Sequence, residues 1–174
     1  MDTRARFMLA GGLATGIALA IADSYADRKR YSIKLDKEMP ASASEVVEII
    51  KQVENEKDLI PIIADVIVHE ASEDCVSYSV RTETGIPASA RYKKCWDDTP
   101  AVYWWSESGT AGFHHAGEIT FTEENGRTIA HLRSEHWLTA PIIGRAIGPA
   151  ILPAIRSELQ SWLDNIAKKL EEKQ

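Results

Sequence analysis

The chain has 174 residues, 44% hydrophobic and 26% charged, which are ordinary proportions for a soluble globular domain. Its formal net charge of −6 provides no basic surface for a phosphate backbone, so we do not expect nucleic acid as the main partner. The length suits one domain with a short extension.

The first 30 residues differ in composition from the rest, and we expect a signal or a membrane anchor there. Two arginines precede an apolar run at residues 7–22, and basic residues occupy positions 28–30. As a single-pass anchor, this apolar helix would hold the domain at the cytoplasmic face of a membrane, because positive charge follows it. As an export signal, it would be cleaved near Ala26, where small residues lie. The remaining interpretation is a soluble helix packed on the domain, which itself spans residues 31–174.

The domain is expected to begin with a strand and two helices. Alternating polar and apolar residues predict a strand at residues 31–39, and Pro40 ends it. Ser42 and Glu45 have the spacing of a capping box, so a helix should follow. A second, shorter helical piece is expected at residues 54–60, before a proline.

From Ile62 onward the hydrophobic period changes to two, and turn-forming residues separate the segments. Asn125-Gly126 is the strongest turn signal, because both central residues of a type I′ hairpin turn need positive φ. The expected strands are residues 63–71, 75–84, 88–97, 101–108, 113–123 and 128–139.

A long amphipathic helix is predicted after Gly148-Pro149, and Pro153 should kink it or mark its start. Its apolar stripe, at steps of three or four residues, consists of Ile151, Ile155, Leu159, Trp162, Ile166 and Leu170. Consecutive antiparallel strands cannot leave an apolar face open to water, so this helix should cover the sheet. The predicted fold class is α+β, a curved antiparallel sheet of about seven strands wrapped around the C-terminal helix, with a cavity between them.

The Asn-Gly turn predicts the register of the last two strands. If Glu124 and Arg127 flank the turn, His115 faces His136 on the inner side of the sheet. Two histidines on a cavity wall could hold a ligand oxygen, exchange protons or supply half of a metal site. The alternative is that both are hydrogen-bonded core residues. We expect no metal, because two ligands without a third are too few, and no other cofactor.

The candidate ligand-binding residues share the inner face of the predicted strands or the apolar stripe of the helix. The register of Trp104 is not fixed, because the loop at residues 109–112 is loose. Plain core packing is the alternative explanation for the aromatic members. The candidates are Tyr78, Tyr92, Trp96, Trp104, Phe113, His115, Ile119, Leu132, His136, Ile155 and Leu159.

The two cysteines are expected to be neighbours on adjacent strands. Paired residues across the turn at residues 85–87 should have numbers that sum to about 171, and Cys75 and Cys95 sum to 170. Both lie on the polar alternation, hence on the outer face. An exported domain would form a disulfide here, whereas a domain facing the cytoplasm would keep two free thiols.

The element order and the entry into the first helix resemble those of the START-like (SRPBCC) superfamily. The resemblance rests on the strand followed by MPASASEVVEIIKQVENEKDLIPIIADVIVHE, on the Asn-Gly hairpin, on Trp137 and on the long final helix, and it covers residues 31–172. The branch of polyketide cyclase/dehydrase and lipid-transport proteins, which includes coenzyme Q-binding proteins, is most similar. The resemblance implies a helix-grip fold with a deep cavity that binds a lipid, sterol, quinone or polyketide, and no cofactor.

Three functions are compatible with these observations. The first is a non-catalytic carrier that binds a hydrophobic small molecule such as a lipid, quinone or polyketide, near a membrane. The second is a cyclase or dehydratase that uses His115 and His136 as acid and base. The third is a membrane-anchored interaction module whose cavity is filled by its own side chains. The sequence has no G-x-S-x-G, H-E-x-x-H or glycine-rich phosphate loop, so no catalytic residue is assigned.

Overall fold

The computed structural model describes residues 29–83 and 88–173. The signal or anchor predicted for residues 1–30 therefore lies almost entirely outside the described residues, and so does the turn at residues 85–87. In the part of the chain that is described, no helix is long and apolar enough to cross a membrane.

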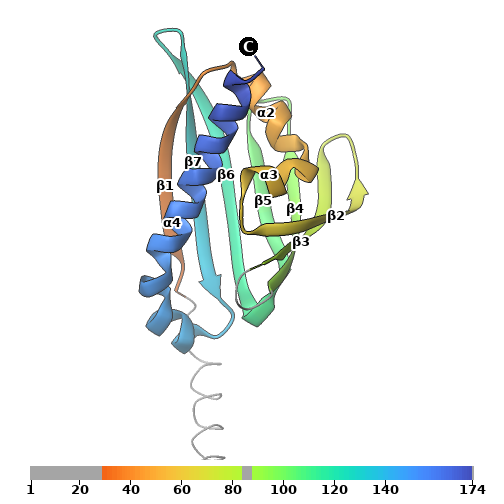
Figure 1. Ribbon diagram of the computed structural model, residues 1–174. Coiled ribbons are helices and arrows are strands. Elements are labelled where there is room, and N and C mark those ends of the chain that lie inside the picture. The colour runs from red at the N-terminus through yellow and green to blue at the C-terminus, as the bar shows by residue number, and fades with distance from the viewer. Residues whose placement is uncertain (1–28, 84–87, 174) are drawn as a thin grey trace, which may run out of the picture.

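The domain is built on a curved seven-stranded antiparallel sheet (Figure 1). Its strand order is β1-β7-β6-β5-β4-β3-β2, so only β1 is displaced from its position in the chain. Alternate burial along β1 matches the predicted pattern, with polar residues outward. The strands are β1 (Tyr31–Met39), β2 (Ile63–Ala71), β3 (Cys75–Thr82), β4 (Ala88–Trp96), β5 (Val102–Gly109), β6 (Phe113–Glu124) and β7 (Arg127–Leu138).

The hairpin between β6 and β7 has the predicted turn and register. Asn125 and Gly126 have φ values of 54° and 76°, as a type I′ turn requires. The ladder runs without a shift from Glu124–Arg127 to Phe113–Leu138 and pairs His115 with His136. Because side chains alternate between the two faces of a strand, this register decides which residues face inward.

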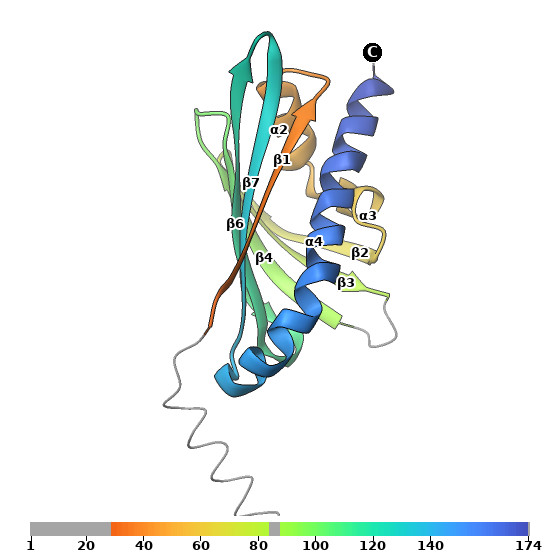
Figure 2. The same cartoon turned by 90° about the vertical axis from the view of Figure 1, so that its left-hand side faces the viewer.

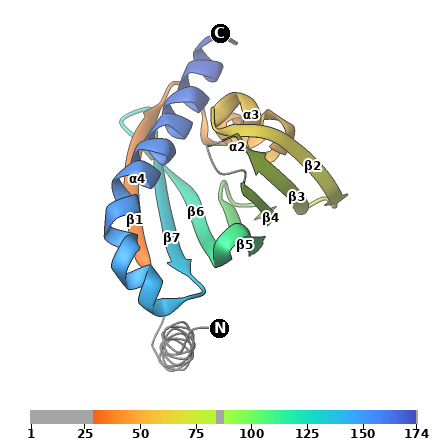
Figure 3. The same ribbon diagram turned by 60° about the horizontal axis from the view of Figure 1, so that its bottom comes forward.

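Two short helices lie at one end of the concave side of the sheet (Figure 3). The helix α2 (Ala43–Lys51) begins with the predicted capping box, in which the Ser42 hydroxyl accepts from the Glu45 backbone and the Glu45 carboxylate accepts from the Ser42 backbone. A 3₁₀ turn, η1 (Val53–Asn55), and the single turn α3 (Glu56–Leu59) follow, where one helical piece was predicted.

The final helix α4 (Pro141–Glu171) begins before the predicted start at Gly148-Pro149. Proline is tolerated at the first helical position, so Pro141 starts the helix rather than merely ending the strands. Pro149 and Pro153 remain inside the helix, although each lacks the N–H of a helical hydrogen bond. Figure 2 shows that the first half of α4 bends away from the axis of the second half, as expected near interior prolines.

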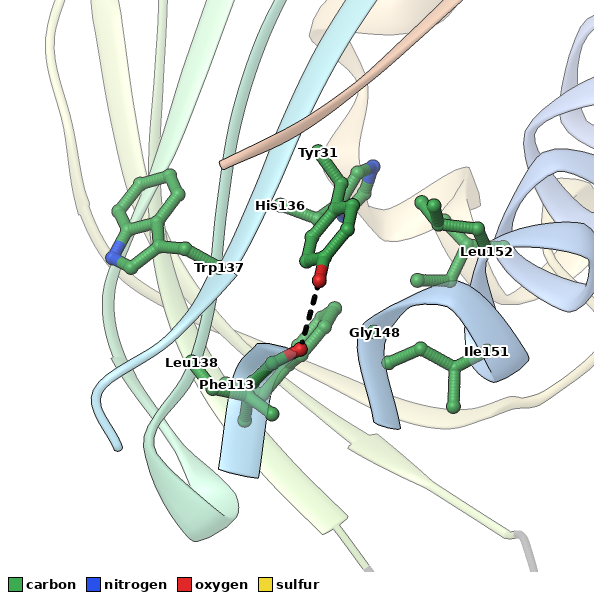
Figure 4. Close-up of a pocket in the computed structure, with 10 residues that line it drawn as sticks. Tyr31, Phe113, His136, Trp137, Leu138, Gly148, Ile151 and Leu152 are labelled. Carbon is green, nitrogen blue, oxygen red and sulfur yellow. Dashed lines mark hydrogen bonds between the residues drawn. The ribbon is translucent and has the colours of Figure 1, made fainter. Parts of the chain in front are cut away.

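Polar contacts fix both halves of α4. In the second half, Lys37 of β1 forms an ion pair with Asp164 at 2.7 Å, and the Asn165 side chain donates to the Leu59 carbonyl of α3 at 2.9 Å. In the first half, the Tyr31 hydroxyl donates to the carbonyl of Gly144 at 3.1 Å (Figure 4).

The ring of Tyr31 packs directly on the backbone of α4 at Gly148. A Cβ at position 148 would lie 2.3 Å from this ring, so a glycine is needed for the close approach. The start of β1 is therefore held against the first half of α4.

The apolar core forms two clusters on the concave side. The larger cluster joins β1, β6, β7 and α2 to the second half of α4 and includes Leu35, Val46, Ile119, Leu132, Leu163 and Ile166. The smaller one lies under β2 and β3 and consists of Val53, Ile63, Val76, Tyr78 and Val80. The helix α4 packs on β1 and β7, at one side of the sheet. It therefore does not cover the inner faces of the strands at the other side.

Cys75 and Cys95 face each other in the β3–β4 ladder, as the register predicts. Their Cα atoms are 4.1 Å apart, and a disulfide joins them. Of the two sequence-based alternatives, the structure therefore has the disulfide rather than the free thiols.

We expect Gly148→Ala to lower the free energy of unfolding by about 1–3 kcal/mol, because the new methyl group overlaps the Tyr31 ring. Urea denaturation measures the change. In a Tyr31→Ala background, the same substitution should instead stabilise the protein by up to about 1 kcal/mol, since alanine favours a helix over glycine. Equal losses in both backgrounds would contradict the proposed contact.

Candidate functional site

A cavity of about 390 Å³ lies between α4, α3 and the inner face of the sheet. Residues from β2 to β7 line it together with α3 and α4. This volume falls in the range of about 300–1,000 Å³ that is usual for small-molecule sites. The cavity is not filled by side chains, contrary to the expectation of the interaction-module hypothesis.

Eight of the eleven predicted site residues line this cavity: Tyr78, Tyr92, Trp104, Phe113, His115, His136, Ile155 and Leu159. The other three do not. Ile119 and Leu132 are buried in the larger core cluster, because the second half of α4 covers this level of the sheet. Trp96 lies at the end of β4, where its indole donates to the Glu73 carbonyl at 2.8 Å and packs beside Lys51.

The predicted histidine pair forms one wall of the cavity. The ring centroids of His115 and His136 are 5.4 Å apart, with the rings edge to face. His115 also stacks on Tyr92 at 4.8 Å, and His136 stacks on Phe113 at 5.9 Å. These four rings form two stacks, nearly perpendicular to each other, and give the cavity an aromatic, weakly polar wall.

Trp104 forms part of the inner wall beside α4. Its ring meets Trp162 edge to face at 5.8 Å. A Cβ at Gly117 on the neighbouring strand would lie 2.4 Å from the Trp104 ring, so this glycine allows the indole to lie against β6. Trp104 therefore faces inward, an orientation that the sequence of the chain did not determine.

A buried ion pair on the cavity wall was not predicted. Lys94 of β4 and Glu56 of α3 are both buried, and their charged groups are in direct contact. The Lys94 ammonium also donates to the Ile50 carbonyl at 3.1 Å and lies 5.4 Å from the centroid of the Tyr78 ring. Lys94 shares the inward alternation of Tyr92 and could have been found from it, but a charged residue is rarely placed inside from sequence alone.

Two further cavity residues, Glu158 and Trp162, were also missed as site residues. Both lie on α4, beside the predicted Ile155 and Leu159. Glu158 is half-buried, and among the described residues its carboxylate has no hydrogen-bond or ion-pair partner. Residues 29–83 and 88–173 contain no group of three or more His, Cys, Asp or Glu side chains that could hold a metal ion.

The fold has counterparts in solved structures. A protein from Thermus thermophilus, TTHA0849, superposes with a TM-score of 0.72 at 18% identity, over 82% of this chain and 99% of that one. The Zhui aromatase/cyclase from Streptomyces sp. R1128 gives 0.69 at 12% identity, over 83% and 96%. Norcoclaurine synthase from Thalictrum flavum gives 0.66 at 15% identity, over 83% and 88%. Another structure of that synthase contains dopamine and hydroxybenzaldehyde.

The chain has a helix-grip fold. Sequence comparison adds no closer relationship, since no protein-family model and no curated protein matches the chain. The structural similarity, at these low identities, concerns the fold, and the function must be argued from the residues of the cavity.

Burial within this helix-grip domain changes the proton affinities of the cavity residues. Burial, and then the neighbouring His136, lowers the pKa of His115 to about 3, and burial lowers the pKa of His136 to about 4. Burial raises the pKa of Glu158 and that of Tyr92. Both histidines are therefore neutral at pH 7. A general acid or base works best with a pKa near the working pH, so this pair is better suited to hydrogen bonding than to proton transfer.

We expect the helix-grip domain to lose stability as the pH falls from 6.5 to 4. Over this range the unfolded chain protonates its histidines, whereas the folded domain keeps His115 and His136 neutral. For His136 alone, the free energy of unfolding should fall by roughly 3 kcal/mol, and His115 should add to this decrease. Denaturant titrations at several pH values measure the slope.

The variants His115→Gln and His136→Gln should each flatten this pH dependence. His69→Gln, which replaces an exposed histidine of β2, provides the matched control for the change of side chain. A slope that is unaffected by both cavity variants would show that neither histidine is held neutral by burial.

Proposed function

We propose that this domain binds a hydrophobic small molecule in the cavity between α4 and the sheet. The observation that carries the proposal is the open volume of about 390 Å³, lined mostly by aromatic and aliphatic side chains with a few polar groups among them. The shared fold with an aromatase/cyclase and with a synthase that holds dopamine and hydroxybenzaldehyde supports it. The neutral histidine pair favours a carrier over an enzyme that uses these rings as acid and base.

A substitution that fills the cavity should weaken binding without unfolding the domain. Ala90 lines the cavity from β4, and Ala90→Trp would place an indole in the open volume. With 1-anilinonaphthalene-8-sulfonate as a fluorescent probe, we expect the dissociation constant to rise at least about tenfold, because the ligand loses the apolar surface that it would bury.

Lys34→Trp, on the exposed outer side of β1, is the matched control and should bind the probe like the unmodified protein. Equal binding by Ala90→Trp and Lys34→Trp would place the probe elsewhere on the protein and contradict the proposal.

The location of the domain is a separate part of the proposal. We propose that residues 1–30 direct the export of the domain. The domain then functions at a membrane, in an oxidising compartment. The Cys75–Cys95 disulfide supports this location, because structural disulfides persist in oxidising compartments and are rare in the cytosol.

Trapping thiols with a maleimide in intact source cells, followed by mass spectrometry of the purified chain, tests this location. We expect Cys75 and Cys95 to react only after reduction. The mass of the chain also distinguishes a retained anchor from cleavage near Ala26. Labelling of both cysteines without reduction would place the domain in a reducing compartment.

A further inference from the structure

The side of α4 that faces away from the sheet is apolar along the first half of the helix. Residues three, four, seven or eight positions apart share one face of a helix. Ile147, the largest residue of this face, is 43% exposed. We call this face the outer stripe of α4. It consists of Ala146, Ile147, Ala150, Pro153 and Ala154, all of them exposed.

The charged residues that border the outer stripe are all basic. Residues 139–157 contain no Asp or Glu, although the whole chain has 26 acidic and 20 basic residues. The charged residues in this range are Arg145 and Arg156, and both are exposed. They are about three helical turns apart, so they lie along the same edge of the outer stripe. An apolar face with basic residues beside it is typical of helices that lie on a lipid surface.

The start of β1 lies beside this half of α4, at the same end of the domain (Figure 2). The Tyr31 hydroxyl donates to the Gly144 carbonyl, and the Tyr31 ring packs on Gly148, so the chain is fixed to α4 at this point. The apolar run at residues 7–22 ends nine residues before Tyr31. Nine residues span at most about 30 Å. A retained anchor would therefore keep the outer stripe close to the membrane, where even a weak contact is formed often.

The side chains at the entry of the chain into the domain suit a lipid surface as well. The Lys29 ammonium is 5.3 Å from the centroid of the Tyr31 ring, and the Arg30 guanidinium is 5.0 Å from that of Trp137. Arg30 also forms an ion pair with Glu135 at 3.2 Å. Tyrosine and tryptophan are enriched at the level of lipid headgroups, and lysine and arginine are attracted to anionic lipids.

We propose that the outer stripe of α4 lies on the surface of an anionic phospholipid bilayer, with Arg145 and Arg156 near the lipid phosphates. This inference rests on the proposed membrane location and specifies the surface of the domain that meets the lipid. Charge favours lipid over the two other groups that could cover the stripe. Residues 7–22 carry no charge that would complement the two arginines, and the stripe of a second copy would bring like charges together.

A fluorescent label on the outer stripe of the full-length chain tests the inference. Cys75 and Cys95 are joined, so Ala150→Cys provides a single thiol for a nitrobenzoxadiazole label, which brightens when it leaves water. We expect the label to brighten at least about threefold on mixed vesicles of phosphatidylcholine and phosphatidylglycerol, and less on vesicles of phosphatidylcholine alone. Lys168→Cys is the matched control, since it places the label on the same side of α4 about 27 Å farther along the helix. Its label should not brighten.

A charge on the outer stripe should weaken this contact. In the chain labelled at position 150, Ile147→Glu should reduce the brightening by at least about twofold, because a carboxylate would have to approach the anionic lipid. Ile67→Glu, at a 55% exposed isoleucine of β2, changes the net charge equally and should leave the brightening unaltered.

Flotation of the vesicles in a density gradient separates the inference from the proposed location. If the chain floats with the vesicles but the labels at positions 150 and 168 respond alike, the inference is wrong and the membrane location stands. A label at position 150 that is already bright without vesicles would show that residues 7–22 or a second copy covers the stripe, and this too overturns the inference. If the chain floats with neither kind of vesicle, the inference and the membrane location both fail.

Discussion

The cavity exists because one helix is narrower than a seven-stranded sheet and is held to one side of it. The helix α4 packs on β1 and β7 at that side, and on α2 and α3. Contacts at both ends fix this position, through Tyr31 in the first half and through Asp164 and Asn165 in the second. The inner faces of β3 and β4 consequently look across an open volume instead of onto a packed helix.

The position of the short helices α2 and α3 over the sheet depends on the ion pair between Lys94 and Glu56. A buried ion pair adds little net stability over apolar residues of similar size, because desolvation offsets the Coulomb attraction, but an unpaired buried charge costs several kcal/mol. Lys94 also donates to the Ile50 carbonyl, so a single ammonium group connects β4 to both α2 and α3. Apolar side chains could pack there in several arrangements, whereas these polar contacts require one position of the short helices relative to the sheet.

Local chemistry made much of the fold predictable from the sequence. Asn125-Gly126 determined a register that holds along the whole β6–β7 ladder, and the capping box located the start of α2. Other features depend on contacts between distant segments. Alternation showed that Ile119 and Leu132 face inward, but which level of the sheet α4 covers depends on where that helix lies. The early start of α4 involves Tyr31, more than 100 residues away in the chain, which supports the helix through Gly144 and Gly148.

The chemistry inside the cavity bears on selectivity as well as affinity. Apolar walls distinguish poorly between ligands of similar size, whereas a site with buried groups that need hydrogen bonds discriminates strongly against a ligand that lacks them. The neutral His115 and the hydroxyl-bearing Tyr92 are polar residues on the wall of this cavity. A charged imidazolium in the same place would favour anions and would carry a desolvation penalty. Because burial keeps both histidines neutral, they can offer hydrogen bonds to an uncharged group without the desolvation penalty of a buried cation.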